Sequence, residues 1–295
     1  MKMLFILCAC VAAVAFCSEN NQGKVVVIPR GITEWGGYRA VDGFSYTANN
    51  SELYMDSTEV TRQLWDSVFS WSLTNGYALS WDASHFSSKG EDYPMHGVTF
   101  FDALIWINAR SEKEGLTPCY LTTNKVPYRR FDDGNVACSF QNTGFRLPTI
   151  EEWEFAAAGG ARWGTTFPHG DTITQEEANF CLIEITADGK KRTLFHPKYH
   201  IGGEPFTSPV ASFAPNGLGL YDMAGNVAEW CWDGFFDEKR GYRDSTLKGG
   251  SWCQDKKFLS IRYTQKFPSA GQESWGAQMT GFRCVRRKTV DGQRL

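Results

Sequence analysis

Glycine and proline punctuate this chain of 295 residues so densely that long regular elements have little room to form. The sequence holds 29 Gly and 11 Pro, spread along its whole length without a Gly/Ser-rich or Pro-rich linker and without a repeat of fixed period. Glycine inside a helix or strand costs about 0.5–1 kcal/mol relative to Ala, and proline removes a backbone donor. We therefore expect a single α+β domain of short elements joined by long ordered loops.

Three segments nevertheless carry the signals of helices. Thr61 and Thr99 each precede apolar residues at helical spacing, which extend to about residue 73 and about residue 114. Thr149-Ile150-Glu151-Glu152 is a capping box, in which the hydroxyl and the last carboxylate each satisfy a free backbone N–H. The helix that follows should end near residue 158, before two glycines. Short strands are expected at Lys24–Ile28, Cys119–Thr122, Ser208–Phe213 and Gly281–Val285.

The N-terminal residues 1–17 are typical of a secretory signal. Lys2 gives a basic start, residues 4–16 are apolar, and the chain turns polar at Ser18. The apolar run is shorter than the ~20 residues that cross a bilayer. Two processing routes stay open: cleavage after Ala15, or lipidation of Cys17. The protein is thus expected to be periplasmic, exposed on the outer surface or secreted, and attached to a membrane only through a lipid anchor at Cys17.

The cysteine count agrees with an oxidising compartment. Nine cysteines include three in the signal region, which leaves an even set of six: Cys119, Cys138, Cys181, Cys231, Cys253 and Cys284. Up to three disulfides are therefore open to the mature chain. Cys119 and Cys138 flank a polar stretch that suits a long hairpin, and they are the preferred pair. No C-x-x-C unit or neighbouring histidine indicates zinc.

The charge balance excludes one class of partner. Lys and Arg together number 30 against 33 Asp and Glu, so the formal net charge is -3. No strong cationic field attracts phosphates, and we expect no nucleic-acid binding.

Three long motifs carry a family resemblance. They lie at residues 144–157, which hold Arg146-Leu147-Pro148-Thr149, at residues 215–230, and at Gly249-Gly250-Ser251-Trp252 together with Gly281-Phe282-Arg283. Weaker matches lie at Glu59-Val60-Thr61 and residues 98–103. In this order the motifs resemble the formylglycine-generating-enzyme (sulfatase-modifying factor) family over residues 24–288. The resemblance implies that family's variant of the C-type lectin fold, with little regular secondary structure.

The resemblance does not extend to the family's catalytic cysteines. Its enzymes hold copper with two cysteines, three and eight residues after the Ser of the Gly-Gly-Ser motif, because soft thiolates suit Cu(I). Gln254 and Leu259 occupy those positions here, and Cys253 lies one residue too early. We predict no catalytic residue and no copper, with a copper-dependent oxidoreductase or another enzyme of the family as the alternative. Cys253 is then a buried thiol or a disulfide partner, of Cys231 or Cys284.

Calcium is the cofactor that the resemblance implies. The family's ligand positions hold Asp222 and Glu229 as side chains and Gly225 and Val227 as backbone carbonyls, and hard oxygen donors suit Ca²⁺. The alternative is that Asp222 caps a turn and Glu229 forms a buried salt bridge. For the family's second calcium site, Asn179 and Phe180 match the first half, but Gly202 stands where an Asp is expected.

The segment between the two parts of the third motif is a candidate ligand surface. Trp252, Tyr263, Phe267 and Trp275 lie in or beside residues 253–280, among polar residues. Exposed aromatic rings with adaptable polar neighbours are typical of binding surfaces, although such rings also serve as local packing for a long loop. The sequence thus predicts an exported interaction module whose ligand is a protein, a peptide or a glycan.

Overall fold

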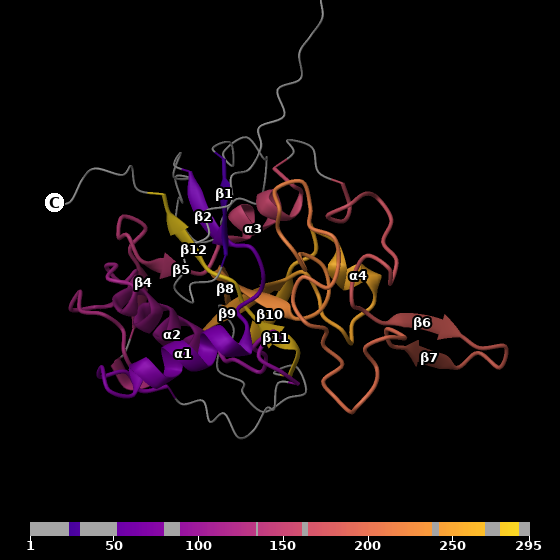
Figure 1. Cartoon of the computed structure of the whole chain (residues 1–295), viewed down its shortest axis with the longest axis horizontal. Coiled ribbons are helices and arrows are strands. Elements are labelled where there is room, and N and C mark those ends of the chain that lie inside the picture. Colours follow the sequence, from indigo (N-terminus) through magenta and orange to yellow (C-terminus); the bar gives the residue numbers. More distant parts are fainter. Residues whose placement is uncertain are drawn as a thin grey trace, which may run out of the picture.

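The computed structural model describes residues 24–29, 52–79, 89–133, 135–160, 165–237, 242–268 and 278–288. Figure 1 shows a single mixed fold in which helices α1 and α2 lie together on one side and a hairpin, β6–β7, projects from the other. The predicted α+β class, with few helices, is confirmed. In this part of the chain no helix combines the length and the apolar character needed to cross a membrane.

Three helices begin where their caps predict. They are α1 (Arg62–Ser72), α2 (Phe100–Lys113) and α3 (Ile150–Ala157), and each follows a threonine whose hydroxyl accepts a backbone N–H three residues on. The predicted capping box is confirmed, because the Glu152 carboxylate also accepts the N–H of Thr149 at 2.9 Å. Helix α3 ends before Gly159 and Gly160, both of which have positive φ. A fourth, short helix is α4 (Lys256–Leu259).

Two four-stranded sheets form the framework. The first has the order β1 (Val25–Ile28), β2 (Leu53–Asp56), β12 (Val285–Arg287), β5 (Phe145–Arg146), with every pair antiparallel. The second has the order β10 (Gln265–Pro268), β9 (Tyr242–Lys248), β8 (Ala228–Asp237), β11 (Thr280–Gly281), with β11 parallel to β8. In Figure 1 the indigo β2 and the yellow β12 lie side by side, so the two ends of the described chain are joined in one sheet.

Two hairpins complete the elements. The pair β3 (Tyr120–Thr122) and β4 (Val136–Cys138) is the hairpin that the spacing of Cys119 and Cys138 predicted, with a 3₁₀ turn at Phe131–Asp133 between the strands. The pair β6 (Leu182–Ile185) and β7 (Lys191–Leu194) is the projecting one. In the described part of the chain all six cysteines are free thiols, and no disulfide joins Cys119 to Cys138 in this structure. The disulfide therefore stays a prediction for the mature protein in an oxidising compartment.

Two of the four predicted strands need correction. Ser208–Phe213 forms no strand, because Pro209 has no N–H to donate to a ladder and Ala211 has a φ of 58°, which no strand accommodates. Gly281–Val285 is divided between sheets: Gly281 pairs with Glu229 in β8, whereas Val285 pairs with Met55 in β2 and with Arg146 in β5. The chain therefore crosses from one sheet to the other within four residues.

The hydrophobic core lies between the helices and the sheets. Trp65 of α1 stacks on Trp106 of α2 with 5.4 Å between ring centroids, and Phe282 meets both rings edge-on. A second cluster surrounds Trp153 of α3, which is fully buried. Phe282 belongs to the three-residue crossing between the sheets, so the core packs around the segment that leads to Arg283.

Candidate functional site

A tight turn at residues 222–227 delivers the predicted calcium ligands to the centre of the fold. Asp222, Gly225 and Asn226 have φ values of 55°, 82° and 59°, so the backbone is left-handed three times within five residues. A Cβ at position 225 would lie 2.3 Å from the carbonyl oxygen of Asn179, which only glycine avoids. The turn then enters β8, whose second residue is Glu229.

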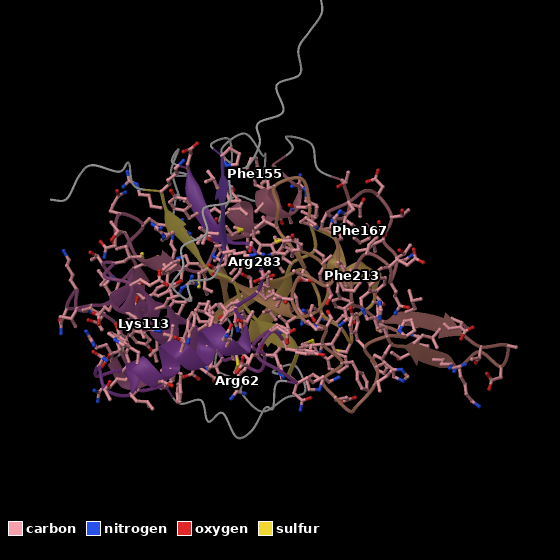
Figure 2. All side chains as sticks on the ribbon, viewed as in Figure 1. Arg62, Lys113, Phe155, Phe167, Phe213 and Arg283 are labelled. Carbon is pink, nitrogen blue, oxygen red and sulfur yellow. The ribbon has the colours of Figure 1, made fainter. Side chains whose placement is uncertain are left out.

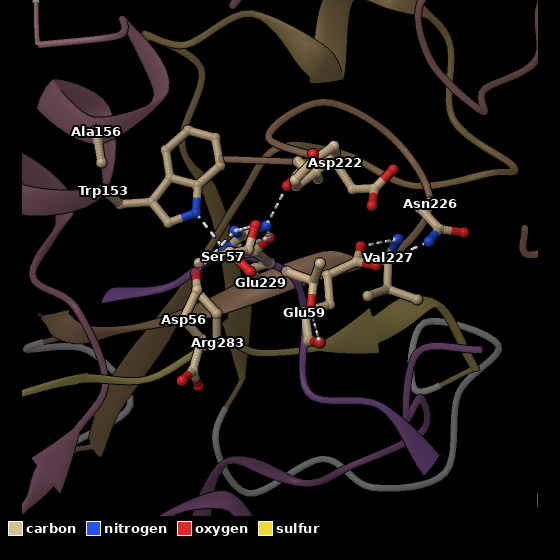
Figure 3. Close-up of polar contacts among 12 residues, drawn as sticks. Asp56, Ser57, Glu59, Trp153, Ala156, Asp222, Asn226, Val227, Glu229 and Arg283 are labelled. Carbon is tan, nitrogen blue, oxygen red and sulfur yellow. Dashed lines mark hydrogen bonds and ion pairs between the residues drawn. The ribbon is translucent and has the colours of Figure 1, made fainter. Parts of the chain in front are cut away.

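Glu229 forms a buried ion pair with Arg283. The guanidinium Nε lies 3.0 and 2.8 Å from the two carboxylate oxygens, and Nη2 lies 2.7 Å from Oε1. Trp153 Nε1 donates to Oε2 at 2.8 Å. These contacts give each oxygen two nitrogen donors, which fills the about four acceptor positions of a carboxylate. Figure 3 shows Trp153 and Arg283 converging on Glu229.

Arg283 also gathers the backbone around it. Its Nη1 donates to the carbonyls of Asp56 and Ser57 at 3.3 Å each, and its Nη2 donates to the carbonyl of Tyr221 at 2.8 Å. Figure 2 places Arg283 in the middle of the molecule, whereas Arg62 lies at its edge. One side chain therefore connects the end of β2, the turn that holds Asp222, and β8.

Two further carboxylates are buried beside this pair. Glu59 accepts Nδ2 of Asn226 at 2.7 Å and the N–H of Val227 at 3.0 Å, while Asp222 accepts the N–H of Ala211 at 2.7 Å. Burial, followed by the charges of Asp222 and Glu229, raises the pKa of Glu59 well above its usual range. Burial raises the pKa of Asp222 to about 6. Three carboxylates thus face one guanidinium, and the cluster carries an excess of acid.

The predicted calcium ligands fit the ion in donor type and in charge. Asp222 has a second oxygen beyond the one that Ala211 uses, and a divalent cation would offset the acidic excess. No three His, Cys, Asp or Glu side chains in the described ranges converge enough to hold a metal, so the carbonyls of Gly225 and Val227 would be required. The competing contacts are present as well: Asp222 accepts a turn N–H, and Glu229 is committed to Arg283.

At the second predicted calcium position one oxygen is available. Asn179 Oδ1 is buried and has no hydrogen-bond partner among the described residues, whereas its Nδ2 donates to the carbonyl of Phe206 at 2.8 Å. Phe180 is fully buried beside it. Gly202 contributes no side chain and lies exposed, so the site lacks the carboxylate that the family places there.

The two positions of the family's catalytic cysteines hold side chains that cannot bind copper as thiolates do. Gln254 donates from Nε2 to Gln265 Oε1 at 2.8 Å. Leu259 is fully buried in an apolar cluster with Phe167, Phe180 and other residues. Neither side chain offers a soft donor, so the predicted loss of the catalytic pair agrees with the local packing.

The structure separates the predicted ligand-surface residues. Trp252 is only 4% exposed and packs against Phe206 with 5.3 Å between ring centroids, so it does not face solvent. Phe267 lies in β10 with its ring 5.6 Å from that of Trp230, so it is partly buried against the core. Trp275 lies outside the described residues. Tyr263 alone among the described candidates lines a pocket.

That pocket has a volume of about 590 Å³ and lies beside α4. Its walls are Thr166, Phe167, Asp171, Thr172, Ile173, Lys256, Lys257, Ser260, Arg262 and Tyr263. Three cationic side chains face one carboxylate, and that carboxylate already accepts the N–H and the hydroxyl of Thr166. The pocket therefore combines a positive rim with an aromatic wall, and Figure 2 shows its Phe167 on the side of the molecule away from Lys113.

Several residues of these sites were missed from the sequence. Glu59, Trp153 and Arg283 lie inside the recognised motifs. Glu59 and Arg283 are charged residues in motifs that otherwise supply core residues, and this contrast could have identified both from the sequence. Phe167, Lys256 and Lys257 lie outside the motifs. Their convergence depends on how residues 165–173 fold against α4, which no local pattern encodes.

Comparison with known proteins agrees with this geometry. The sulfatase-modifying factor enzyme 1-like domain matches residues 12–288. Chaperone protein LppX of Paenibacillus barcinonensis is 29% identical over 301 residues, which cover 97% of this chain and 99% of that protein. Inactive C-alpha-formylglycine-generating enzyme 2 of Mus musculus is 35% identical over 162 residues, which cover 54% of this chain and 48% of that protein. The latter match therefore spans only about half of each sequence.

A solved structure shares the fold. The crystal structure of CarF superposes with a TM-score of 0.67 at 25% sequence identity, covering 90% of this chain and 98% of that one. The two proteins therefore share the overall fold.

The Arg283–Glu229 pair yields a first prediction. Arg283→Met removes the guanidinium that, within the described residues, faces the three carboxylates, and it should lower the free energy of unfolding by about 3–5 kcal/mol, since a buried charge left without its partner is strongly destabilising. Arg62→Met is the matched control: its pair with Asp66 is partly exposed, and its loss should cost less than about 1 kcal/mol. Urea unfolding followed by circular dichroism measures both. Equal losses for the two variants would contradict the central role of Arg283.

Proposed function

This chain belongs to the family of sulfatase-modifying factor enzyme 1-like domains, and we propose that it is an exported, non-catalytic binding module of that family. The observation that carries the proposal is the content of residues 254–263. Where the family's enzymes hold copper, this chain has a hydrogen-bonded Gln254 and a buried Leu259. The same segment supplies Lys256, Lys257 and Tyr263 to an open pocket. Catalytic groups are thus replaced by groups suited to binding.

The names of two relatives support a role other than catalysis. LppX is called a chaperone protein and resembles this chain along nearly its whole length. The mouse relative is called inactive and resembles about half of this chain. A chaperone acts on another protein, so we take the partner of this module to be a protein segment.

The pocket indicates the chemistry of that segment. Lys256 and Lys257 are exposed, and Arg262 is half exposed beside Glu154. The charges of Lys256, Lys257 and Arg262 exceed that of Asp171, and Phe167 and Tyr263 offer ring surface. An acidic peptide that carries an apolar or aromatic side chain satisfies both features, because opposite charge steers the encounter and the ring surface adds apolar contact.

Calcium is proposed as a structural component of this module. Asp222 and the carbonyls of Gly225 and Val227 would hold it, and Glu229 would join them by giving up one of its present hydrogen bonds to Arg283 or Trp153. Bound there, Ca²⁺ would supply positive charge to the acidic cluster and tie the turn to β8. It takes part in no chemical step of the proposed function.

The first prediction from this proposal concerns catalysis. The full chain, reduced and loaded with copper, should convert no cysteine to formylglycine in a sulfatase-motif peptide, because positions 254 and 259 offer no thiolate pair. Mass spectrometry of the peptide, which detects the loss of the thiol, measures the conversion. A formylglycine-generating enzyme of the family serves as the positive control. Conversion of the peptide by this chain at a rate comparable with that of the control enzyme would contradict the non-catalytic proposal.

The second prediction concerns the pocket. A fluorescent oligoglutamate peptide with one tryptophan should bind the full chain, and binding should weaken as salt rises. Lys256→Glu together with Lys257→Glu should lower the affinity about tenfold, which corresponds to about 1.4 kcal/mol. Lys190→Glu together with Lys191→Glu, on the exposed hairpin, is the matched control and should change little. Fluorescence anisotropy gives each affinity.

Two results would count against the acidic-peptide pocket. If the hairpin variant (Lys190→Glu with Lys191→Glu) weakens binding as much as the pocket variant (Lys256→Glu with Lys257→Glu), the peptide binds only by non-specific charge attraction. A sulfated oligosaccharide that binds while the peptide does not would assign the pocket to a glycan.

The third prediction concerns calcium. Chelation should lower the melting temperature, because an ion bound only by the folded state adds about 2.7 kcal/mol at a hundredfold excess over Kd. Calcium should restore the lost stability and magnesium should do so poorly, since Mg²⁺ demands a tighter octahedron. Asp222→Asn should abolish the response while keeping the acceptor for Ala211, whereas Asp188→Asn on the exposed hairpin should not. If chelator and calcium leave the melting temperature unchanged in the unmodified protein and in both variants, no calcium is bound. Asp222 then caps a turn and Glu229 forms only a buried salt bridge.

A further inference from the structure

The projecting hairpin β6–β7 has an open strand edge, outside every site described above. The two strands form a separate two-stranded sheet, and Figure 1 shows them extending away from the rest of the molecule. Thr186 and Lys190 close the hairpin, since the N–H of Thr186 donates to the carbonyl of Lys190 at 2.9 Å. Gly189, with a φ of 79°, completes the turn between them. The closing bond fixes the hydrogen-bond pattern of the whole hairpin.

This pattern determines which backbone groups of β6 point away from β7. In an antiparallel pair, residues that exchange hydrogen bonds alternate with residues whose N–H and C=O point outward. Counting back from the closing pair, Glu184 turns its backbone groups toward β7, whereas Ile183 and Ile185 turn theirs outward. Among the described residues, no backbone hydrogen bond joins Ile183 or Ile185 to a segment outside the hairpin. The open edge of β6 therefore consists of the N–H and C=O groups of these two isoleucines.

The side chains of β6 leave this edge unprotected. Successive side chains of a strand alternate between its faces, so Ile183 and Ile185 lie on one face of the hairpin. They are 42% and 61% exposed. Natural proteins usually cover an edge strand or place charges on it, above all lysine. Strand β7 carries Lys191 and Arg192, whereas the charged residue of β6 is Glu184. The two edges of the hairpin therefore differ, and that of β6 is the one suited to pairing.

We propose that the open edge of β6 binds an extended segment of another protein, which adds an antiparallel strand to the hairpin. The outward N–H and C=O groups of Ile183 and Ile185 match those of an extended backbone, and strand addition is a general mode of peptide recognition. Main-chain hydrogen bonds would supply the affinity, and the side chains of β6 would select the sequence. The site is separate from the pocket beside α4, and the charge of its ligand is opposite.

The side chains of β6 indicate a segment with the pattern apolar, basic, apolar. Side chains opposite Ile183 and Ile185 would cover the exposed isoleucines, so apolar β-branched residues suit these positions. The residue opposite Glu184 would be Lys or Arg. In the added pairing this position is not hydrogen-bonded, which brings the two facing side chains closest together and favours opposite charges.

A second copy of this chain does not suit the edge. Pairing β6 with β6 so that both isoleucines are used places Glu184 opposite Glu184, and like charges directly opposite destabilise a sheet. Pairing β6 with the β7 of another copy stacks the two hairpins about 10 Å apart, the width of two strands. A domain of this length has a radius of gyration of about 19 Å, so the two bodies would collide. The occupant is therefore a segment of a different protein.

The test uses a fluorescein-labelled heptapeptide with valine at its third and fifth positions, lysine at its fourth and threonine elsewhere. Fluorescence anisotropy with the full chain should show saturable binding. N-methylation of both valines removes the N–H groups that face β6 and should weaken binding about tenfold, since two backbone hydrogen bonds are lost. N-methylation of the lysine, whose N–H faces away from β6, should change the affinity little. Glutamate in place of the lysine should weaken binding.

Variants of the protein test the same edge from the other side. Ile183→Pro removes an outward N–H that the hairpin does not use, and proline is tolerated at such edge positions, so the fold should be kept while binding weakens about tenfold. Glu184→Gln should weaken binding by up to about fivefold, the upper range for a cross-strand charge pair. Thr193→Pro is the matched control, because Thr193 pairs with Ile183 and its N–H points outward from β7. Far-UV circular dichroism confirms that each variant is folded.

Four outcomes would overturn the site. The first is no saturable binding of the valine–lysine peptide, and the second is equal affinity for the peptide methylated on its valines. The third is a loss of affinity in Thr193→Pro as large as that in Ile183→Pro. The fourth is a dimer in analytical ultracentrifugation that becomes a monomer in Ile183→Pro, which would assign the edge to a second copy of the chain.

Discussion

The buried ion pair between Arg283 and Glu229 is the interaction on which the rest of the structure depends. A guanidinium inside a protein costs several kcal/mol to desolvate unless its donors are matched by acceptors in good geometry. Here the acceptors come from β8 through Glu229, from the end of β2 through two carbonyls, and from the turn at Tyr221. These segments can satisfy the charge only if they meet around it. The burial of one side chain thus fixes where these three segments lie around Arg283.

A fold with so little regular secondary structure needs other connections of this kind. Arg110 of α2 pairs with Asp56 of β2 at 2.7 Å, Arg146 of β5 pairs with Glu152 of α3 at 2.6 Å, and Lys248 of β9 pairs with Glu154 of α3 at 2.8 Å. Each pair joins a helix to a strand, and each is almost fully buried. Short strands satisfy few backbone groups by themselves, so side chains complete the network that longer ladders would otherwise provide. Loss of one partner would leave an unpaired charge in the interior, which is strongly destabilising.

The rigid framework leaves the segment after the Gly-Gly-Ser-Trp motif free to differ in chemistry. Gln254 and Leu259 occupy the places of two cysteines without disturbing the sheets, because Leu259 joins an existing apolar cluster and Gln254 finds an amide partner. The neighbouring Lys256, Lys257 and Tyr263 then line a pocket. Because a loop can change its side chains while the fold stays the same, we propose that this segment supports binding in place of catalysis.

The sequence by itself determined the features that depend on neighbouring residues. The caps at Thr61, Thr99 and Thr149 and the glycines after α3 act within one helical turn, and the contiguous motifs carried the family and its fold. The tertiary structure alone decided the features that join distant residues. It divided residues 281–285 between two sheets, buried Trp252 against Phe206, formed the pocket between Phe167 and α4, and brought the thiol of Cys181 to the carbonyl of Cys253. These arrangements depend on where loops meet in space. The burial of charged groups and aromatic rings across the whole chain decides where they meet, and a short stretch of sequence contains no information about it.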